Sequence, residues 1–357
     1  MRRSDVIDWL KATGISLIVY GHVAHATTVP WTPPIYVKQL GVTLFLFATG
    51  FTLARERRDP VEVLFNRLFP VYLFGLATAL VITTWGLLSQ TGLALSNYLP
   101  FLGGANVVFN NFPANPTTWY LGTYLHLLVL WAVWLRRVRL GTSTILALLV
   151  IEIPVRAVLI TWAGPYIAYM FLTNWIAVFV AGLVVGGRPS SDPDDSAVPY
   201  AVALVGGLVV WSIAVEPLGI KPTFPFMTVE QWSPMLSTVA VSAAVSFLYL
   251  SSTLTAYAAL RRVVAPAPVR FIARHSLIIF LVHMPVFLAL NPVLSALHMT
   301  TASKVAVQLL VCLPGLAGLS AVVMGVVRPK DLRERLFAAL NRGRRHAAGE
   351  LPFLEQQ

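Results

Sequence analysis

The chain has 357 residues, of which 57% are hydrophobic and 11% are charged, and its formal net charge is +11 at pH 7. A soluble domain does not need that much apolar surface, so the composition excludes a soluble enzyme and indicates a polytopic membrane protein. The basic residues stand between apolar segments, which favours a role in membrane topology over nucleic-acid binding. The single cysteine, Cys312, excludes an intramolecular disulfide and most thiolate metal sites.

Ten segments of about twenty mostly apolar residues predict membrane-spanning helices. The fifth is the weakest, because Glu152, Pro154 and Arg156 interrupt it. In chain order the expected spans are 6–27, 36–55, 68–90, 117–135, 143–163, 166–186, 198–216, 233–256, 271–291 and 304–327. We therefore expect an all-α transmembrane bundle of about ten spans as one domain over 1–327, followed by a basic tail over 328–357.

The arginines gather in alternate connections, which all fall on one side of these spans. They precede the first span, flank the turn between the second and third, follow the fourth, join the eighth to the ninth, and fill the tail. The positive-inside rule makes all of these connections cytoplasmic and predicts that both termini are inside. The tail is amphipathic at first, so we expect it on the inner membrane surface or disordered.

His22, near the far end of the first span, is the first candidate for chemistry. An imidazole deep in a lipid-spanning helix is costly, and it can act as a general base near neutral pH. Lys11 lies eleven residues earlier, so both side chains share one helix face, about 16 Å apart along the axis. The structural alternatives are a helix–helix hydrogen bond for His22 and snorkelling to the headgroups for Lys11.

Arginines crowd the turn between the second and third spans. Such clusters usually only anchor topology, but one beside a buried reactive site can also hold the phosphates of a nucleotide-bearing donor. They are Arg55, Arg57, Arg58 and Arg67.

Later spans carry further polar or aromatic features. Trp119 and Tyr120 open the fourth span, where an aromatic belt is the default explanation. Glu152 and Arg156 are spaced to pair on one face, either structurally or as part of a substrate path. His283 is a second imidazole at membrane depth. Metal and nucleotide-hydrolysis motifs are missing from the sequence.

Five pieces of sequence together point to a known family. They are Asp8-Trp9-Leu10-Lys11 followed by His22, then Phe45 to Phe51, Arg67 to Pro70, Trp119-Tyr120-Leu121, and Ser276 to Pro285. In this order and spacing they resemble the motifs of the integral-membrane acyltransferase family 3, found in bacterial O-acetylation of cell-surface sugars and in macrolide acylation. Lys11 stands where the family usually has Arg, and Thr49 where it usually has Ser.

The resemblance implies a multi-pass enzyme of a bacterial-type inner or plasma membrane. It would move an acyl group, expected to be acetyl, from cytoplasmic acyl-CoA to a hydroxyl of a glycan, glycolipid or macrolide, without a metal. Its partners would be membrane lipids, the donor and the acceptor, and not nucleic acid.

The resemblance also assigns roles to residues. His22 would be catalytic, taking the acceptor's proton or first accepting the acyl group itself. Lys11, Arg55 and Arg67 would hold the CoA end. The supporting residues would be Asp8, His283, Trp119 and Tyr120. His22 is expected near the outer face, so the donor's arm must thread a tunnel or the acyl group must be relayed.

Two other classes of protein remain open on the sequence. A non-enzymatic carrier or flippase could line its path with the same buried ionisable residues. A structural subunit of an envelope-polymer complex would show neither transport nor acyl transfer.

Overall fold

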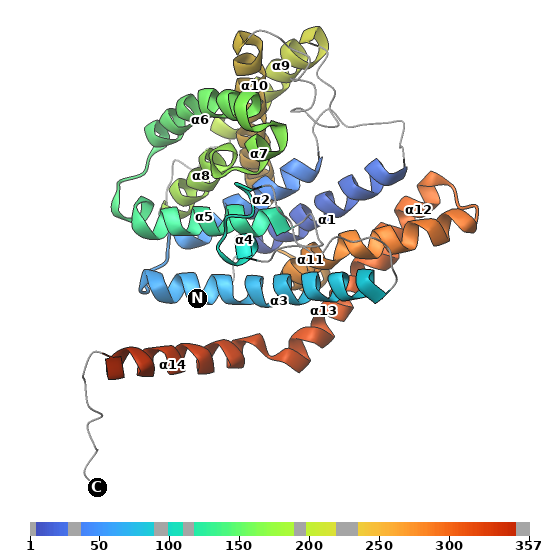
Figure 1. Ribbon diagram of the computed structural model, residues 1–357. Coiled ribbons are helices and arrows are strands. Elements are labelled where there is room, and N and C mark those ends of the chain that lie inside the picture. Colours follow the sequence, from blue (N-terminus) through green and yellow to red (C-terminus); the bar gives the residue numbers. More distant parts are fainter. Residues whose placement is uncertain are drawn as a thin grey trace.

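The computed structural model describes residues 5–27, 37–88, 99–109, 118–188, 198–218 and 235–347. These residues form helices and their connections, without any strand in the described ranges (Figure 1). The first half contains α1 (Asp5–Thr27), α2 (Val37–Leu53), α3 (Pro60–Leu88), α4 (Leu99–Leu102), α5 (Trp119–Val133), η2 (Leu135–Arg137) and α6 (Thr142–Ala163). The second half contains α7 (Pro165–Met170), η3 (Leu172–Asn174), α8 (Ile176–Gly187), α9 (Val198–Leu218), α10 (Met235–Leu260), α11 (Ala267–Ala296), α12 (Thr301–Val307), η5 (Gln308–Cys312), α13 (Leu313–Val327) and α14 (Pro329–Ala347).

Every expected span coincides with helical structure. The sixth is divided into α7, η3 and α8, and the tenth into α12, a π-helical turn (η5) and α13. Within the described residues, four segments are long and apolar enough to cross a membrane, so the expected number of ten spans stays a prediction. The four segments are Pro60–Leu88, Thr142–Ala163, Ala267–Phe287 and Thr301–Val327. The interrupted fifth segment is among these four, and its two charged side chains, Glu152 and Arg156, are buried inside the protein.

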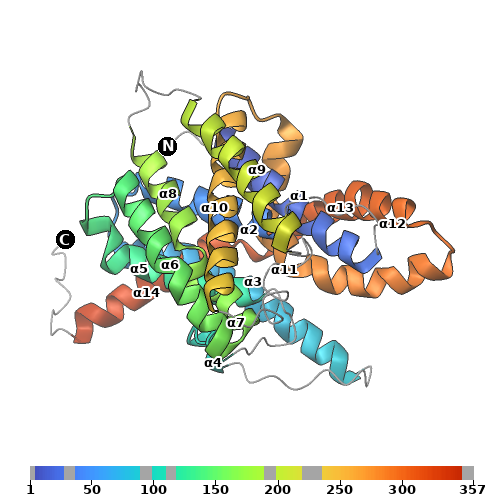
Figure 2. The ribbon, with the colours of Figure 1, turned by 90° about the horizontal axis from the view of Figure 1, so that it is seen from above.

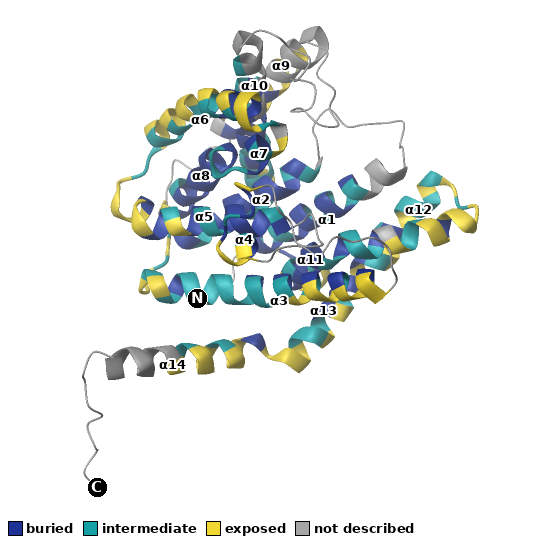
Figure 3. Ribbon diagram, in the orientation of Figure 1, coloured by how far each residue is buried: buried dark blue, intermediate teal, exposed yellow. Residues whose placement is uncertain are grey.

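The centre of the bundle is built on α1, α2, α8 and α11. Helix α1 packs against α2 and α11, and α2 packs against α8 (Figure 1). Figure 3 shows α2 and α8 as mostly buried, whereas α11 is buried along its middle and exposed towards its two ends. Helix α8 is apolar on all sides, and nearly every residue from Ile176 to Gly186 is buried, as expected for a helix surrounded by others.

Glycines let the central helices approach very closely. A Cβ atom on Gly50 of α2 would overlap the carbonyl oxygen of Phe179 on α8. A Cβ on Gly182 or on Gly186 of α8 would in turn overlap a backbone carbonyl of α2. Small residues at a helix interface allow this packing in a membrane, where apolar burial alone does not distinguish protein from lipid.

Several outer helices expose large apolar side chains. Val81 and Trp85 of α3, Val150 and Trp162 of α6, and Val326 of α13 are each more than half exposed. Figure 3 shows exposed residues along the outer sides of α6, α12 and α3. An apolar surface of this extent requires a non-aqueous neighbour, and lipid is that neighbour for a bundle of this composition.

Helix α14 follows α13 after a turn (Figure 1), and seen from above its far end emerges from beneath the bundle near α5 and α6 (Figure 2). Arg328 adopts a left-handed backbone conformation, with φ of 44°, after α13 ends, and Pro329 then starts α14. The ring of Phe337 lies 5.2 Å from the ring of Phe65 on α3. The amphipathic start of the expected tail is thus helical and packs against α3, while residues 348–357 lie outside the described ranges.

Gly182→Ala tests the α2–α8 contact with the smallest possible side chain. We expect the substitution to cost about 1–3 kcal/mol, because the new methyl group overlaps backbone that cannot move aside. Thermal unfolding of the purified protein in detergent measures it. Gly318→Ala on α13 is the matched control, because a Cβ there meets no atom within 4 Å. Equal melting temperatures for the two variants would contradict the close contact.

Candidate active site

Two histidines from helices far apart in the sequence meet inside the bundle. His22 lies on α1 and His283 on α11, and their ring centroids are 5.1 Å apart. His283 is fully buried, whereas His22 is partly buried. The meeting follows from the packing of α1 against α11. Two imidazoles at this distance would repel each other if both were charged, which disfavours protonation of both rings at once.

The backbone fixes the orientation of His283. Its Nδ1 atom lies 2.7 Å from the carbonyl oxygen of Phe280 and 3.2 Å from that of Ile279. Carbonyl oxygens only accept hydrogen bonds, so Nδ1 carries the hydrogen and the neutral ring presents a bare lone pair at Nε2. Among the described residues, this buried Nε2 has no hydrogen-bond partner. An unsatisfied acceptor in such a place is suited to receive a proton or a donor group.

A cavity of about 230 Å³ approaches the histidine pair from the other end of α1. Its charged groups are Lys11 and Arg67, and Thr49, Thr52 and Ser276 contribute hydroxyls. Its aromatic walls are Phe45, Tyr120, Tyr124 and Phe280. We call it the inner cavity. A few polar groups in an apolar, aromatic wall are typical of a small-molecule site.

Hydrogen bonds order the polar side of the inner cavity. Arg67 Nη2 donates to Thr52 Oγ1 at 2.9 Å, and Thr52 in turn donates to the carbonyl oxygen of Thr49 at 2.9 Å. The Thr49 hydroxyl donates to the carbonyl oxygen of Phe45 at 2.9 Å. Threonine therefore supplies a hydroxyl at the position where the related family usually has serine. Arg67 is held on α3 facing α2, with its charge directed at the cavity.

Phe280 separates the inner cavity from the histidines. It lines the cavity, its ring lies 5.9 Å from the ring of His283, and it packs 5.0 Å from the ring of Tyr120. Phe280 precedes His283 by three residues, so both side chains share a face of α11. This residue lies within the late motif of the sequence, but sequence reasoning gave it no role. Its spacing from His283 was the signal that could have found it.

The remaining predicted residues occupy different places. Asp8 is buried on α1, one turn before Lys11, but is not part of the cavity lining. Arg55 also lies away from the lining: its Nε donates to the carbonyl oxygen of Gly186 at 2.9 Å and its guanidinium lies over the Phe51 ring. The structure thus uses Arg55 to join α2 to α8.

Trp119 belongs to an internal aromatic cluster. Its ring stacks on the buried Trp175 at 5.9 Å and lies 5.0 Å from the ring of Tyr169. Trp175 stacks further on Tyr249 of α10 at 5.2 Å. An interfacial aromatic belt, the default explanation from sequence, is therefore not needed here. Tyr120, the next residue, reaches the inner cavity.

Glu152 and Arg156 form the predicted pair on α6. Arg156 Nη2 donates to Glu152 Oε1, the Ser246 hydroxyl donates to the same carboxylate at 2.7 Å, and both charged side chains are almost fully buried. The opposite charges of Glu152 and Arg156 compensate each other inside the protein, which supports a structural role for the pair. Within the described ranges, no group of three or more His, Cys, Asp or Glu side chains is placed to hold a metal ion.

Fold and site together define a helical membrane protein with a buried imidazole pair beside a basic, hydroxyl-lined cavity. The sequence profile of the acyltransferase domain known as acyltransferase family 3 matches residues 5–325, most of the chain, and the protein belongs to this family. Every piece of the resemblance found in the sequence lies within the matched range. No curated protein and no solved structure matches the chain.

Arg156→Met tests whether the α6 pair is structural. We expect a loss of about 3–5 kcal/mol in unfolding free energy, because Glu152 would be left buried without its cation, and Glu152→Leu added to it should restore most of the loss. Thermal unfolding measures both variants. Lys330→Met, in the exposed pair with Glu334, is the control and should change nothing measurable. A stable single variant that lacks activity would indicate a substrate role instead.

Proposed function

We propose that the protein is an acyl-CoA-dependent O-acyltransferase in which His22 is the catalytic base. The observation that carries this proposal is the contact between His22 and His283 just beyond the inner cavity. Family membership supports acyl transfer as the reaction class. The donor, the acyl group and the acceptor are part of the proposal and follow from what the family resemblance implies.

The proposed reaction uses the histidine pair for proton transfer. His22 takes the proton of the acceptor hydroxyl while the hydroxyl oxygen attacks the thioester carbonyl carbon. The C–S bond then breaks, and the thiolate leaving group receives the proton from the imidazolium. His283, with its Nδ1 hydrogen committed to the backbone, offers Nε2 as an acceptor that orients His22 and stabilises its charged form. In the other possible route, His22 first accepts the acyl group itself.

Lys11 and Arg67 would face the donor. Both line the inner cavity, and a cation there can stabilise the negative charge that develops on the thioester oxygen or neutralise a phosphate. Lysine acts as a point charge where arginine would act as a fork, so its contact is less directional. Asp8, Trp119 and Tyr120 would support the site by packing and by local charge.

The size of the inner cavity favours a short acyl group. Its volume of about 230 Å³ lies below the ~300–1,000 Å³ of common ligand pockets. This space suits the slender end of a thioester donor carrying acetyl better than it suits a long chain. The acceptor, a hydroxyl of a glycan, glycolipid or macrolide, would approach His22 from the opposite end of α1.

The membrane topology is part of the same proposal. Ten spans with both termini in the cytoplasm would place Lys11 on the donor side and His22 nearer the outer face of a bacterial-type inner or plasma membrane. About 16 Å of α1 separates the two residues, a distance that the donor's arm would bridge. The basic connections support this orientation through the positive-inside rule.

His22→Ala tests the proposed reaction. Purified protein in detergent, given acetyl-CoA and candidate glycosides, should release thiol about 10²–10⁴ times more slowly than the wild type, because the general base is gone. His283→Ala should also be slowed. His298→Asn is the matched control: the residue is exposed, and asparagine tolerates its positive φ.

Unchanged acyl transfer by His22→Ala would overturn the mechanism. A carrier or flippase would instead move solute across proteoliposomes without any need for acyl-CoA. A structural subunit would be stable and inactive in both assays.

Phe280→Ala tests the separation of the cavity from the histidines. Removing the ring should join the two spaces and raise kcat/KM for hexanoyl-CoA relative to acetyl-CoA, by about tenfold for removal of a steric block of several methylene groups. Leu277→Ala is the control, because it enlarges the same cavity nearly two turns away from His283. The same change in selectivity in both variants would show that cavity volume, and not the ring of Phe280, sets the preference.

A further inference from the structure

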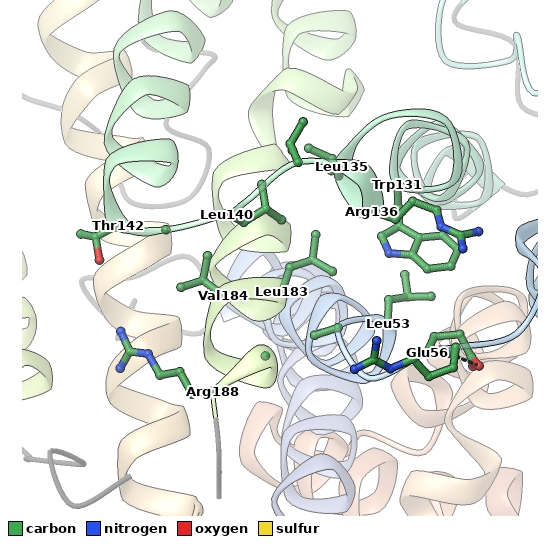
Figure 4. Close-up of a pocket in the computed structure, with 15 residues that line it drawn as sticks. Leu53, Glu56, Trp131, Leu135, Arg136, Leu140, Thr142, Leu183, Val184 and Arg188 are labelled. Atoms are coloured by element: carbon green, nitrogen blue, oxygen red, sulfur yellow. Dashed lines mark hydrogen bonds between the residues drawn. The ribbon is translucent and has the colours of Figure 1, made fainter.

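A second and larger cavity of about 760 Å³ lies where α2, α5 and α8 end (Figure 4). It is bounded by the connection after α2, the connection from α5 to α6, and the end of α8. It shares no lining residue with the inner cavity, so it is a separate site. We call it the arginine cavity, after Arg57, Arg136 and Arg188 in its lining.

The charge of this cavity is positive. Glu56 is the one carboxylate among its lining residues, and it is already engaged by Arg58, whose Nη2 lies 2.7 Å from Glu56 Oε2 and whose Nε lies 3.0 Å from Oε1. These hydrogen bonds lower the pKa of Glu56 to about 2, so the carboxylate stays ionised and paired with Arg58. The positive charges of Arg57, Arg136 and Arg188 therefore remain available to an anion.

The start of α6 adds to the positive potential. Gly141 and Thr142, at the beginning of this 22-residue helix, line the cavity. The first backbone N–H groups of a helix point outward from its start and carry a partial positive charge. The N–H groups of Gly141 and Thr144 already donate to Thr144 Oγ1 and to the Gly141 carbonyl oxygen, so the helix start adds its positive potential to that of the arginines.

The rest of the lining is apolar. In Figure 4, Leu140, Leu183 and Val184 lie between Arg188 on one side and Arg136 on the other. The guanidinium of Arg136 lies over the ring of Trp131 at 5.7 Å, which holds it beside the apolar wall. Such a lining suits a molecule with an anionic head and an apolar or flat part, and does not suit a free inorganic ion.

We propose that the arginine cavity is a second ligand site that binds the phosphate group of an amphiphile. Two sources offer this chemistry. One is an anionic phospholipid, whose headgroup a basic pocket between membrane helices binds well. The other is the nucleotide end of the acyl donor, and only this source rests on the proposed function. Separate binding measurements, one for each kind of ligand, distinguish the two sources.

Binding is measured on the full chain in detergent with two probes. Native mass spectrometry measures retention of phosphatidylglycerol, with phosphatidylcholine as the zwitterionic comparison, and equilibrium titration measures the affinity for coenzyme A. The test variant is Arg136→Gln with Arg188→Gln. The charge-matched control is Arg137→Gln with Arg139→Gln, two exposed arginines of the same connection that lie outside the cavity lining.

The test variant should bind one of the probes about tenfold more weakly, the effect expected when charge-assisted hydrogen bonds are lost, while the control variant binds like the wild type. If the test variant binds only phosphatidylglycerol more weakly, the site is assigned to lipid. If it binds only coenzyme A more weakly, the site is assigned to the donor. Equal weakening in both variants would reduce the effect to general surface charge and overturn the proposal, as would no weakening in either.

A cavity-filling variant gives an independent test that leaves every charge in place. Gly187 lines the cavity and a Cβ there meets no atom within 4 Å, so Gly187→Leu fills the space without a backbone clash. The Gly187→Leu substitution should weaken binding of the same probe. Gly318→Leu on α13 should leave binding unchanged, because a Cβ there also meets no atom within 4 Å. If His22→Ala abolishes acyl transfer while these variants bind both probes normally, the second site fails and the proposed function stands.

Discussion

A polar side chain inside this bundle must find its partner within the protein, because lipid offers none. The structure meets part of this requirement with pairings inside the bundle. Glu152 is neutralised by Arg156, and the Nδ1 atom of His275 lies 2.9 Å from the Ser320 hydroxyl. Several buried polar atoms of the described residues have no hydrogen-bond partner, and Nε2 of His283 is one of them. What distinguishes His283 is its position beside His22, with the two ring centroids 5.1 Å apart.

Helical periodicity was sufficient to predict part of the site. The stripe of Lys11 and His22 follows from 3.6 residues per turn in a continuous α1, and the pairing of Glu152 with Arg156 follows from their i, i+4 spacing. The contact between His22 and His283 could not be predicted in the same way, because it depends on which helices are neighbours. Family resemblance supplied both histidines, but only the packing of α1 on α11 brings them together.

Sequence reasoning was least able to assign the arginines. Arg55, Arg57 and Arg67 belong to one basic cluster in the sequence, yet each faces a different environment. Arg67 turns to the inner cavity, Arg55 ties α2 to α8, and Arg57 reaches the arginine cavity. Their directions depend on where α2 ends and on the glycine-mediated contact between α2 and α8, and charge patterning alone contains neither fact.

The position of Phe280 has a consequence for the competing reaction with water. In the proposed reaction, water that reached both His22 and the thioester would hydrolyse the donor before an acceptor arrived. Phe280 packs against Tyr120 on the cavity side and approaches His283 on the other, so this aromatic pair would limit the passage of water between the proposed donor site and His22. His283 itself is fully buried, which keeps its lone pair away from solvent. The same packing that makes the imidazole costly to bury thus protects the step for which it would be used.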